Sequence, residues 1–357
     1  MASYNRLNPE DTAVSTDKVV SNTWSNDVNI LTTQIFTASV QAASTTATSQ
    51  GNFFIEVYTS ASNQTVPNGG GTEIQGEGNP EFTVSYGHKT GLGAANFTNT
   101  AGALENTATK CIYRQYAQLV FGDENSNFVF NGHEPNGIYV VNISRARYKH
   151  GLKAGSLNLK LNDGSNTSPY TLTDDSVTLT GSAVVTNLGR QFNLVEGTDG
   201  VMTGTNLNQS TNANKGSYGF VYPEAGVIIF NEDALIDEDT GTHFIVPTGN
   251  TNEKMNLKMV GAIQRGASFE LDSEERVSSQ YMFVRVKNGE YNYSSNPSYI
   301  DTNGNLNNTT MVDSPTTYVT TIGLYNDDNN LLAVAKLSQP LKKDFTTEAL
   351  VRVKLDY

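Results

Sequence analysis

Short runs in which apolar and polar residues alternate constrain the fold of this chain more than any other feature. Three of them are EFTVSY at residues 81–86, SLNLKLN at 156–162 and ALVRVKLDY at 349–357. In each run every second side chain is apolar, which is the period of a strand that buries one face. We therefore expect strands at these positions, with their apolar side chains facing a core.

Turn-forming residues separate these runs. The chain of 357 residues contains 31 Gly, and Asn and Thr are also abundant. Gly and Asn tolerate the positive φ of turns, whereas Thr favours strands. This composition predicts an all-β fold, mainly antiparallel β-sandwich sheets and hairpins, with a few short helices and long surface loops. Residues 63–80 and 196–217 lack apolar periodicity and are expected to be such loops, or contact arms toward neighbouring subunits.

Two internal hairpins are expected from turn residues. In GFVYPEAGVIIF, at 219–230, Pro223 is expected at the second position of a type I turn, with Gly226 closing it. Asn288 and Gly289 stand between two runs of aromatic and β-branched residues. Asn-Gly accepts positive φ at both central positions of a type I′ turn, so a second hairpin is predicted there.

A third hairpin is expected near the C-terminal end of the sequence. Residues 318–325 and 331–337 are predicted to pair across the Asn- and Asp-rich loop 326–330. Pro340 is expected to break this ladder because proline has no N–H to donate. The alternating run 349–357 then predicts a final strand that belongs to a sheet.

Helix signals are few. Residues 8–20 begin with Asn, Pro and two acidic residues, which favours a short helix. Residues 231–239 are expected to start another helix, and Gly151 is a candidate helix end. Three segments follow from these patterns: an N-terminal arm with a short helix at 1–30, a β-rich body with long loops at 31–260, and a C-terminal hairpin region packed on the body at 261–357.

Charge and cysteine content restrict the partners. The formal net charge is −13, with 23 Lys and Arg against 36 Asp and Glu. Phosphates repel such a chain, so a nucleic-acid partner is not expected. The one cysteine, Cys111, fits a reducing compartment and is expected to be buried rather than a nucleophile. No signal-peptide pattern and no apolar run of membrane-spanning length is seen, so synthesis in a cytoplasm and no membrane span are expected.

Catalytic and metal motifs are not found in the sequence. The four histidines lack the spacing of a metal site, and neither a P-loop nor a G-x-S-x-G motif occurs. Residues 301–313 resemble an EF-hand loop but lack its Gly and its final Glu. Glycan-cleaving carboxylates are left open, although the only tryptophan, Trp24, makes a sugar site less favoured. The sequence therefore predicts a protein that is not an enzyme, with no catalytic, cofactor or metal residues.

One basic cluster stands out in this acidic chain. It consists of Arg145, Arg147, Lys149 and Lys153. If this stretch is extended, its first three cations share one face, which predicts a docking patch for an acidic neighbour. Alternatively, they are charges that protect an edge strand, or the cationic last turn of a helix.

Four stretches resemble virion structural proteins of large contractile-tailed phages, including cyanophage-like myoviruses. The strongest is YVTTIGLYNDDNNLLAVAKLSQP at 318–340, which is similar to a hairpin of tail-fibre collar and baseplate proteins. The others are MASYNRLNPEDTAVSTDKVV at 1–20, YRQYAQLVFGDE at 113–124 and GIYVVNISRARYKHGLKAGSLNLKL at 137–161.

The resemblance implies a structural component of a phage tail, as a baseplate wedge or tail-fibre attachment protein. It implies other virion proteins as partners, homo-oligomeric contacts, and a location in the virion after synthesis in the host cytoplasm. Two alternatives stay open: a neck or head-decoration protein of the same virion, and a glycan-binding component of a tail spike.

Overall fold

The computed structural model describes residues 5–25, 30–31, 35–38, 54–59, 79–93, 107–162, 170–203, 215–235 and 255–356. The chain divides into two compact units. Unit 1 comprises Met1–Lys18 and Arg276–Tyr357, and unit 2 comprises Val19–Glu275. Unit 1 thus joins the N-terminal residues to the C-terminal region, a grouping that spans the first and last of the three expected segments.

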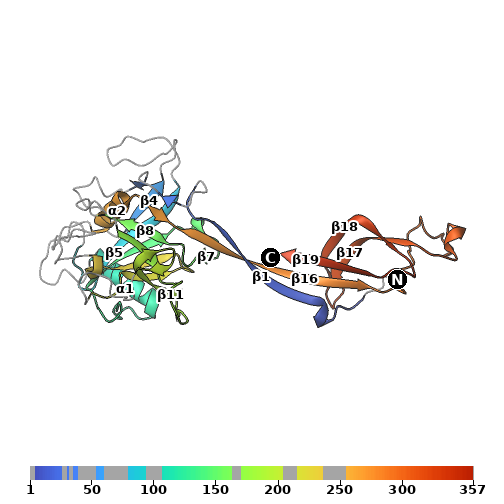
Figure 1. Cartoon of the computed structure of the whole chain (residues 1–357), viewed down its shortest axis with the longest axis horizontal. Coiled ribbons are helices and arrows are strands. Elements are labelled where there is room, and N and C mark those ends of the chain that lie inside the picture. Colours follow the sequence, from blue (N-terminus) through green and yellow to red (C-terminus); the bar gives the residue numbers. More distant parts are fainter. Residues whose placement is uncertain are drawn as a thin grey trace. The chain divides into compact units, whose positions relative to one another are not determined.

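Unit 2 contains a thirteen-stranded sheet in which every strand pairing is antiparallel (Figure 1). Two of these thirteen strands, β10 (Val184–Thr186) and β12 (Val201–Met202), pair with β11 beside the main path. The main path runs β2 (Ile30–Leu31), β15 (Phe269–Glu270), β8 (Asn158–Leu161), β9 (Tyr170–Asp174), β11 (Gly189–Thr198), β13 (Gly219–Tyr222), β14 (Val227–Asn231), β6 (Gly137–Ile143), β5 (Pro80–His88), β4 (Phe54–Thr59) and β3 (Ile35–Ala38).

The central strands of this sheet are buried on both faces. In β6, Tyr139 and Val141 contribute to one apolar core, whereas Ile138 and Val140 contribute to the other. Helix α2 (Met255–Gly266) supplies side chains to the first core and α1 (Ala108–Phe121) to the second, so the two helices cover different sides of the strands (Figure 1). Burial on both faces explains why these strands read as continuous apolar runs rather than alternating ones.

Helix α1 was not predicted from the sequence. It starts at the cap Thr107, whose hydroxyl accepts from the Lys110 N–H, and it ends at Gly122, where φ is 79°. It packs closely against β5 at Gly87, where a Cβ would lie 2.8 Å from the Tyr113 backbone nitrogen. The prediction that Cys111 is buried is wrong, because this residue lies on the exposed side of α1.

Unit 1 holds two small groups of strands. In one, β16 (Asp272–Val286) pairs with β1 (Thr12–Asn22) and, between Ser279 and Val286, with β19 (Ala349–Asp356). In the other, β17 (Thr317–Tyr325) pairs with β18 (Leu331–Lys343). The opposite end of β16, in unit 2, pairs with β7 (Gly151–Leu152).

The predicted fold class is confirmed: the described chain is mostly antiparallel β structure, with two α-helices and four short 3₁₀ helices. The 3₁₀ helices are η1 (Pro9–Asp11), η5 (Arg145–Arg147), η6 (Asp233–Leu235) and η7 (Thr309–Met311). The β13–β14 hairpin and the alternation along β19 are also confirmed. In the first hairpin the Gly226 N–H points to the Pro223 carbonyl at 3.4 Å, so proline opens the turn instead of occupying its second position.

The C-terminal hairpin is confirmed with one change. Strand β18 continues past Pro340, and Val319 pairs with Leu341 beyond it. The pairing nevertheless shifts register between this pair and the pair of Thr321 with Lys336. Proline therefore distorts the ladder without ending the strand.

The hairpin predicted at Asn288 and Gly289 is wrong. Neither residue has positive φ, and the Glu290 N–H donates to the Lys287 carbonyl in an ordinary turn. The strand that pairs with β16 before this turn is β19, which lies far along the chain. The preference of Asn-Gly for a tight hairpin is overridden because β19 pairs with eight residues of β16.

The predicted N-terminal helix is largely wrong. Asn8 and Pro9 do begin a helical turn, and the Asn8 N–H donates to the Asp11 carboxylate at 3.2 Å. The turn ends at Asp11, and β1 follows because five of its eleven residues are Thr or Val, whose β-branched side chains favour strands.

Other local predictions are corrected in unit 2. Asn231 ends β14 and its side chain accepts from the Asp233 N–H at 3.2 Å, so only the 3₁₀ turn η6 follows before the described residues end at 235. Gly151 begins β7 instead of ending a helix. Within the expected loop 196–217, the first residues belong to the β11–β12 hairpin, and 204–214 lie outside the described residues, as do 63–78 of the other expected loop.

Candidate functional site

The four basic residues of the predicted docking patch do not form one face. Arg145 and Arg147 lie on η5 rather than on a strand. The Arg145 guanidinium donates to the backbone carbonyls of Tyr148 and Lys149 and lies 4.6 Å from the centre of the Tyr148 ring. These contacts hold the turn between β6 and β7, and they occupy donors that an acidic partner would need.

The other three cations face carboxylates of this same chain. Arg147 Nε lies 3.9 Å from Glu81, whose side chain is buried in β5. Lys149 Nζ lies 2.6 Å from Glu275, and Lys153 Nζ lies 3.7 Å from Asp272. A docking role for these residues therefore remains a prediction, and a partner would have to compete with internal carboxylates.

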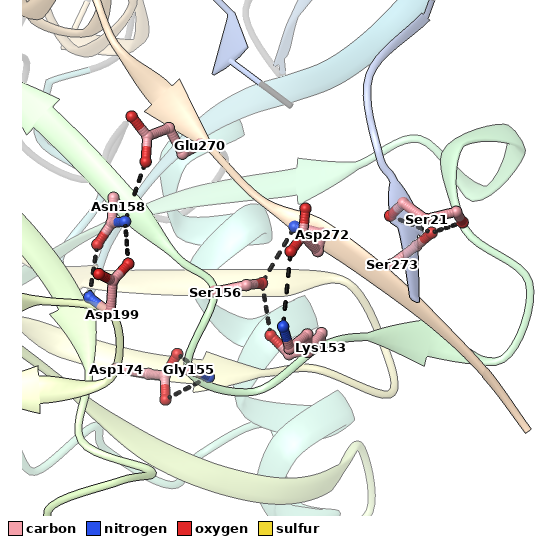
Figure 2. A network of polar contacts seen from close by, with 10 residues as sticks. All are labelled: Ser21, Lys153, Gly155, Ser156, Asn158, Asp174, Asp199, Glu270, Asp272 and Ser273. Carbon is pink, nitrogen blue, oxygen red and sulfur yellow. Dashed lines mark hydrogen bonds and ion pairs between the residues drawn. The ribbon is translucent and has the colours of Figure 1, made fainter. Parts of the chain in front are cut away.

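Lys153 borders a polar network that ties the ends of several strands together (Figure 2). The Ser156 hydroxyl donates to the Lys153 carbonyl at 2.7 Å and accepts from the Asp272 N–H at 3.0 Å. The Gly155 N–H donates to the Asp174 carboxylate at 2.9 Å. Burial raises the pKa of Asp174, an effect that its hydrogen bonds oppose.

Asn158 is the hub of the second part of this network. Its amide nitrogen donates to Asp199 at 2.7 Å and to Glu270 at 3.0 Å, and its oxygen accepts from the Asp199 N–H at 2.8 Å (Figure 2). One neutral side chain thus separates two carboxylates that would otherwise repel each other. These bonds join β8, β15 and the turn between β11 and β12.

A second titratable cluster surrounds Glu232, directly after β14. The Tyr86 hydroxyl donates to Glu232 at 2.8 Å, and burial raises the pKa of this carboxyl to about 7. Nearby, His133 Nε2 lies 2.7 Å from Asp233. Burial also lowers the pKa of His88 to about 4, partly opposed by the charge of Asp233. A carboxyl that titrates near neutrality has the chemistry of an acid–base group.

Packing around Glu232 argues for a structural role. A Cβ added at Gly137 would lie 1.9 Å from Glu232 Oε2, so this carboxylate fills the space beside the start of β6. In the part of the chain that the structure describes, no group of three His, Cys, Asp or Glu side chains could hold a metal ion. His243 lies outside that part.

Unit 1 differs from unit 2 in what it buries. Both apolar cores belong to unit 2. Among the described residues of unit 1, the buried apolar side chains are Val286, Leu324 and Val353. Large apolar side chains of unit 1 are instead exposed, and they include Val14, Tyr293, Val312, Tyr318, Tyr325, Leu331, Leu332, Val334, Phe345 and Leu350.

The β17–β18 hairpin carries the densest group of these exposed side chains. Among the described residues its two strands pair only with each other. A two-stranded sheet is marginally stable in water unless one of its faces is covered. We regard this hairpin as the candidate functional site, namely a surface for binding another protein.

Comparison with known proteins identifies no relative: no family model, no curated protein and no solved structure matches the chain. None of the described helices has the length and apolar character needed to cross a membrane.

Sequence reasoning located the candidate hairpin but missed the Glu232 cluster. The hairpin is local, and its alternation is visible in the printed sequence. The cluster is assembled from β5, the residues before β6 and the end of β14, and an acidic pair directly after a buried apolar run was its only sequence signal.

Proposed function

We propose that this chain is a structural component of a phage virion, in the tail baseplate, and that it acts through protein–protein assembly rather than catalysis. The observation that carries the proposal is the poor core of unit 1 combined with the apolar side chains on its strands. Such a unit is stable when neighbouring subunits cover it, which is the situation of a protein built into a particle.

The assignment to a phage tail rests on the resemblance of residues 1–20, 113–124, 137–161 and 318–340 to contractile-tail proteins. The strongest of these stretches is the β17–β18 hairpin itself, so the most similar segment and the candidate binding surface coincide.

The two alternatives differ in what supports them. A neck or head-decoration protein would use the same exposed strands, so only its location distinguishes it. A glycan-binding spike component would favour an exposed tryptophan, yet Trp24 is 2% exposed and its Nε1 donates to the Phe269 carbonyl at 2.8 Å. That burial favours the assembly role.

Locating the chain in purified particles tests the proposal. We expect mass spectrometry of gradient-purified phage to detect the chain in multiple copies, and antibodies against it to label the tail tip in electron micrographs. Labelling at the neck or capsid would support the first alternative, and a positive glycan array the second. Absence of the chain from intact particles would refute the virion role.

A further inference from the structure

The turn that follows β16 places an Asn-Gly pair at the surface of unit 1. Asn288 and Gly289 are both exposed, and the Glu290 N–H closes the turn by donating to the Lys287 carbonyl at 3.1 Å. Such a turn is closed by its fourth N–H, so the Gly289 N–H at its third position takes no part in the closing bond. In the described part of the chain, no atom would lie within 4 Å of a Cβ added at Gly289. Solvent therefore reaches the pair.

The carbonyl oxygen of Asn288 accepts hydrogen bonds from two buried side chains. Lys343 Nζ donates to it at 2.8 Å and Asn292 Nδ2 at 2.7 Å. This carbonyl belongs to the same peptide unit as the Gly289 nitrogen, and resonance couples the two atoms. Donors held against the oxygen stabilise the negative charge that would spread onto it if the nitrogen lost its proton. The Gly289 nitrogen is thereby made a better nucleophile.

The acceptors of the Lys343 ammonium are neutral oxygens. Besides the Asn288 carbonyl they are Asn292 Oδ1 and the Asp344 carbonyl, each at 2.8 Å. The carboxylate of Asp344 instead faces Lys342 Nζ at 3.2 Å. A buried positive charge acts strongly on a negative charge that forms beside it, because the interior screens charge less than water does. The ammonium can therefore stabilise an anion at the Asn288 carbonyl.

We propose that Asn288 is a site of spontaneous covalent modification, at which the folded chain converts this asparagine to isoaspartate, and that Lys343 promotes the conversion. The reaction consumes one water molecule and releases ammonia, so it needs no cofactor and no second protein. The inference is independent of the proposed virion role, because it depends only on the fold of unit 1.

The first step closes a ring. The Gly289 nitrogen loses its proton to a solvent base and attacks Cγ of the Asn288 side chain. The nitrogen–Cγ bond forms, the Cγ–Nδ2 bond breaks, and the side-chain amide group takes up a proton and leaves as ammonia. The product is a succinimide, in which the Gly289 nitrogen is bonded to both the backbone carbonyl carbon and Cγ of residue 288. Glycine favours this step because it leaves the nitrogen unobstructed.

The second step opens the ring with water. Attack on the backbone carbonyl carbon breaks its bond to the Gly289 nitrogen and gives isoaspartate, whose chain continues through Cγ. Attack on Cγ gives aspartate instead. In the first route negative charge develops on the oxygen that Lys343 and Asn292 bind, so that route is favoured. It also leaves a carboxylate at this position, which gives the buried ammonium an opposite charge.

A second exposed Asn-Gly pair of unit 1 provides an internal comparison. Asn303 and Gly304 also lie in a turn, but the Gly304 N–H donates to the Asp301 carbonyl at 3.1 Å. The nitrogen that would have to attack the Asn303 side chain is therefore already engaged. The two pairs share their residue types and their exposure, and they differ in the contacts of the reacting peptide unit.

Mass spectrometry of the full-length chain, aged in the folded state at neutral pH and body temperature, tests the inference. Trypsin releases residues 288–336 as one peptide, so Asn288 and Asn303 are measured together. A brief digestion limits conversion during handling, and electron-transfer fragmentation distinguishes isoaspartate from aspartate. We expect Asn288 to convert roughly tenfold faster than Asn303, mainly to isoaspartate. Equal rates at the two sites would contradict the proposal.

A substitution tests the role of the ammonium. Lys343→Met should slow conversion at Asn288 by roughly tenfold and lower its share of isoaspartate, with Asn303 unchanged. Lys342→Met is the matched control, because this exposed neighbour faces Asp344, and it should alter neither site. A looser turn by itself would speed the reaction, so faster conversion at Asn288 in a folded Lys343→Met chain would overturn the proposal.

A comparison without substitution decides the case in which Lys343→Met unfolds unit 1. In the unchanged chain unfolded by urea, Lys343 no longer lies against the Asn288 carbonyl. The share of isoaspartate formed at Asn288 should therefore be higher in the folded chain than in the unfolded chain. An equal or lower share in the folded chain would show that the ammonium does not direct the reaction, and the inference would be wrong.

Discussion

Lys343 Nζ donates to Asn292 Oδ1 at 2.8 Å, and both side chains are buried. The same ammonium donates to the carbonyls of Asn288 and Asp344, each also at 2.8 Å. Three oxygen atoms thus replace the water around a fully buried charge, which would otherwise be very unfavourable. These bonds attach the turn after β16 to the end of β18.

Replacing this lysine should loosen unit 1. Lys343→Met keeps the length of the side chain but leaves three carbonyl oxygens without their donor, at a cost of about 1–3 kcal/mol. Hydrogen exchange at residues 287–292 should become faster, and the urea midpoint of this unit should fall. Lys287→Met, at an exposed position of the same turn, is the matched control and should change neither measurement.

Stability should depend on pH through Glu232. Its folded pKa is about 7 against an ordinary value of 4.5, so the stability from proton uptake is fully present below pH 4.5. It is lost as pH rises through 7, by about 3 kcal/mol in total. Glu232→Gln retains an acceptor for Tyr86 and removes the titration. Its unfolding free energy relative to the unchanged chain should therefore increase between pH 5 and 8, and a constant difference would contradict the assignment.

His88 should act in the opposite direction. Its folded pKa is about 4 against 6.5, so its contribution is fully present above pH 6.5 and is lost as pH falls through 4. His88→Asn keeps an acceptor for the Thr90 N–H, which donates to His88 Nδ1 at 3.1 Å. The stability of this variant relative to the unchanged chain should rise as the solution is acidified. Since the two groups offset each other, the unchanged chain should show the flattest profile of the three.

Asn158 should tolerate no acidic replacement. Asn158→Asp removes two donors and places a third carboxylate beside Asp199 and Glu270, so we expect a loss of about 3 kcal/mol or more at pH 7. Asn158→Ala removes both donated bonds and the acceptor of the Asp199 N–H, but it adds no charge and should cost less. Chemical denaturation at pH 7 and pH 4 measures both variants; only the aspartate variant should recover at the lower pH.

Deleting residues 349–357 should make the chain insoluble. The deletion removes β19, which pairs with eight residues of β16 from Ser279 to Val286 and buries Val353. The exposed edge and apolar face of β16 would then favour aggregation. The soluble fraction after expression is the measurement, and a soluble truncated chain with an unchanged melting temperature would contradict the expectation.

Local patterns predicted those features of the fold that depend on few neighbours. The β13–β14 and β17–β18 hairpins join adjacent segments, so their turns and their alternation are both visible in the sequence. The prediction of a hairpin at Asn288 was wrong because β16 pairs with β19, which lies more than sixty residues away in the sequence. Helix α1 was not predicted because its aromatic and β-branched residues favour strands locally. Its two ends, at Thr107 and Gly122, carry capping residues that turns also use.

The sequence by itself determined that the chain is built mainly of antiparallel strands, because period-two alternation and frequent turn residues are local properties. It also determined the candidate hairpin. Tertiary structure alone decided that Arg147 and Lys149 face internal carboxylates, that Glu232 lies beside Tyr86, and that unit 1 combines both ends of the sequence. Each of these three features depends on which segments, distant in the sequence, lie together in the fold. Burial against such segments determines which charges pair and how far the pKa of a carboxyl such as Glu232 is shifted.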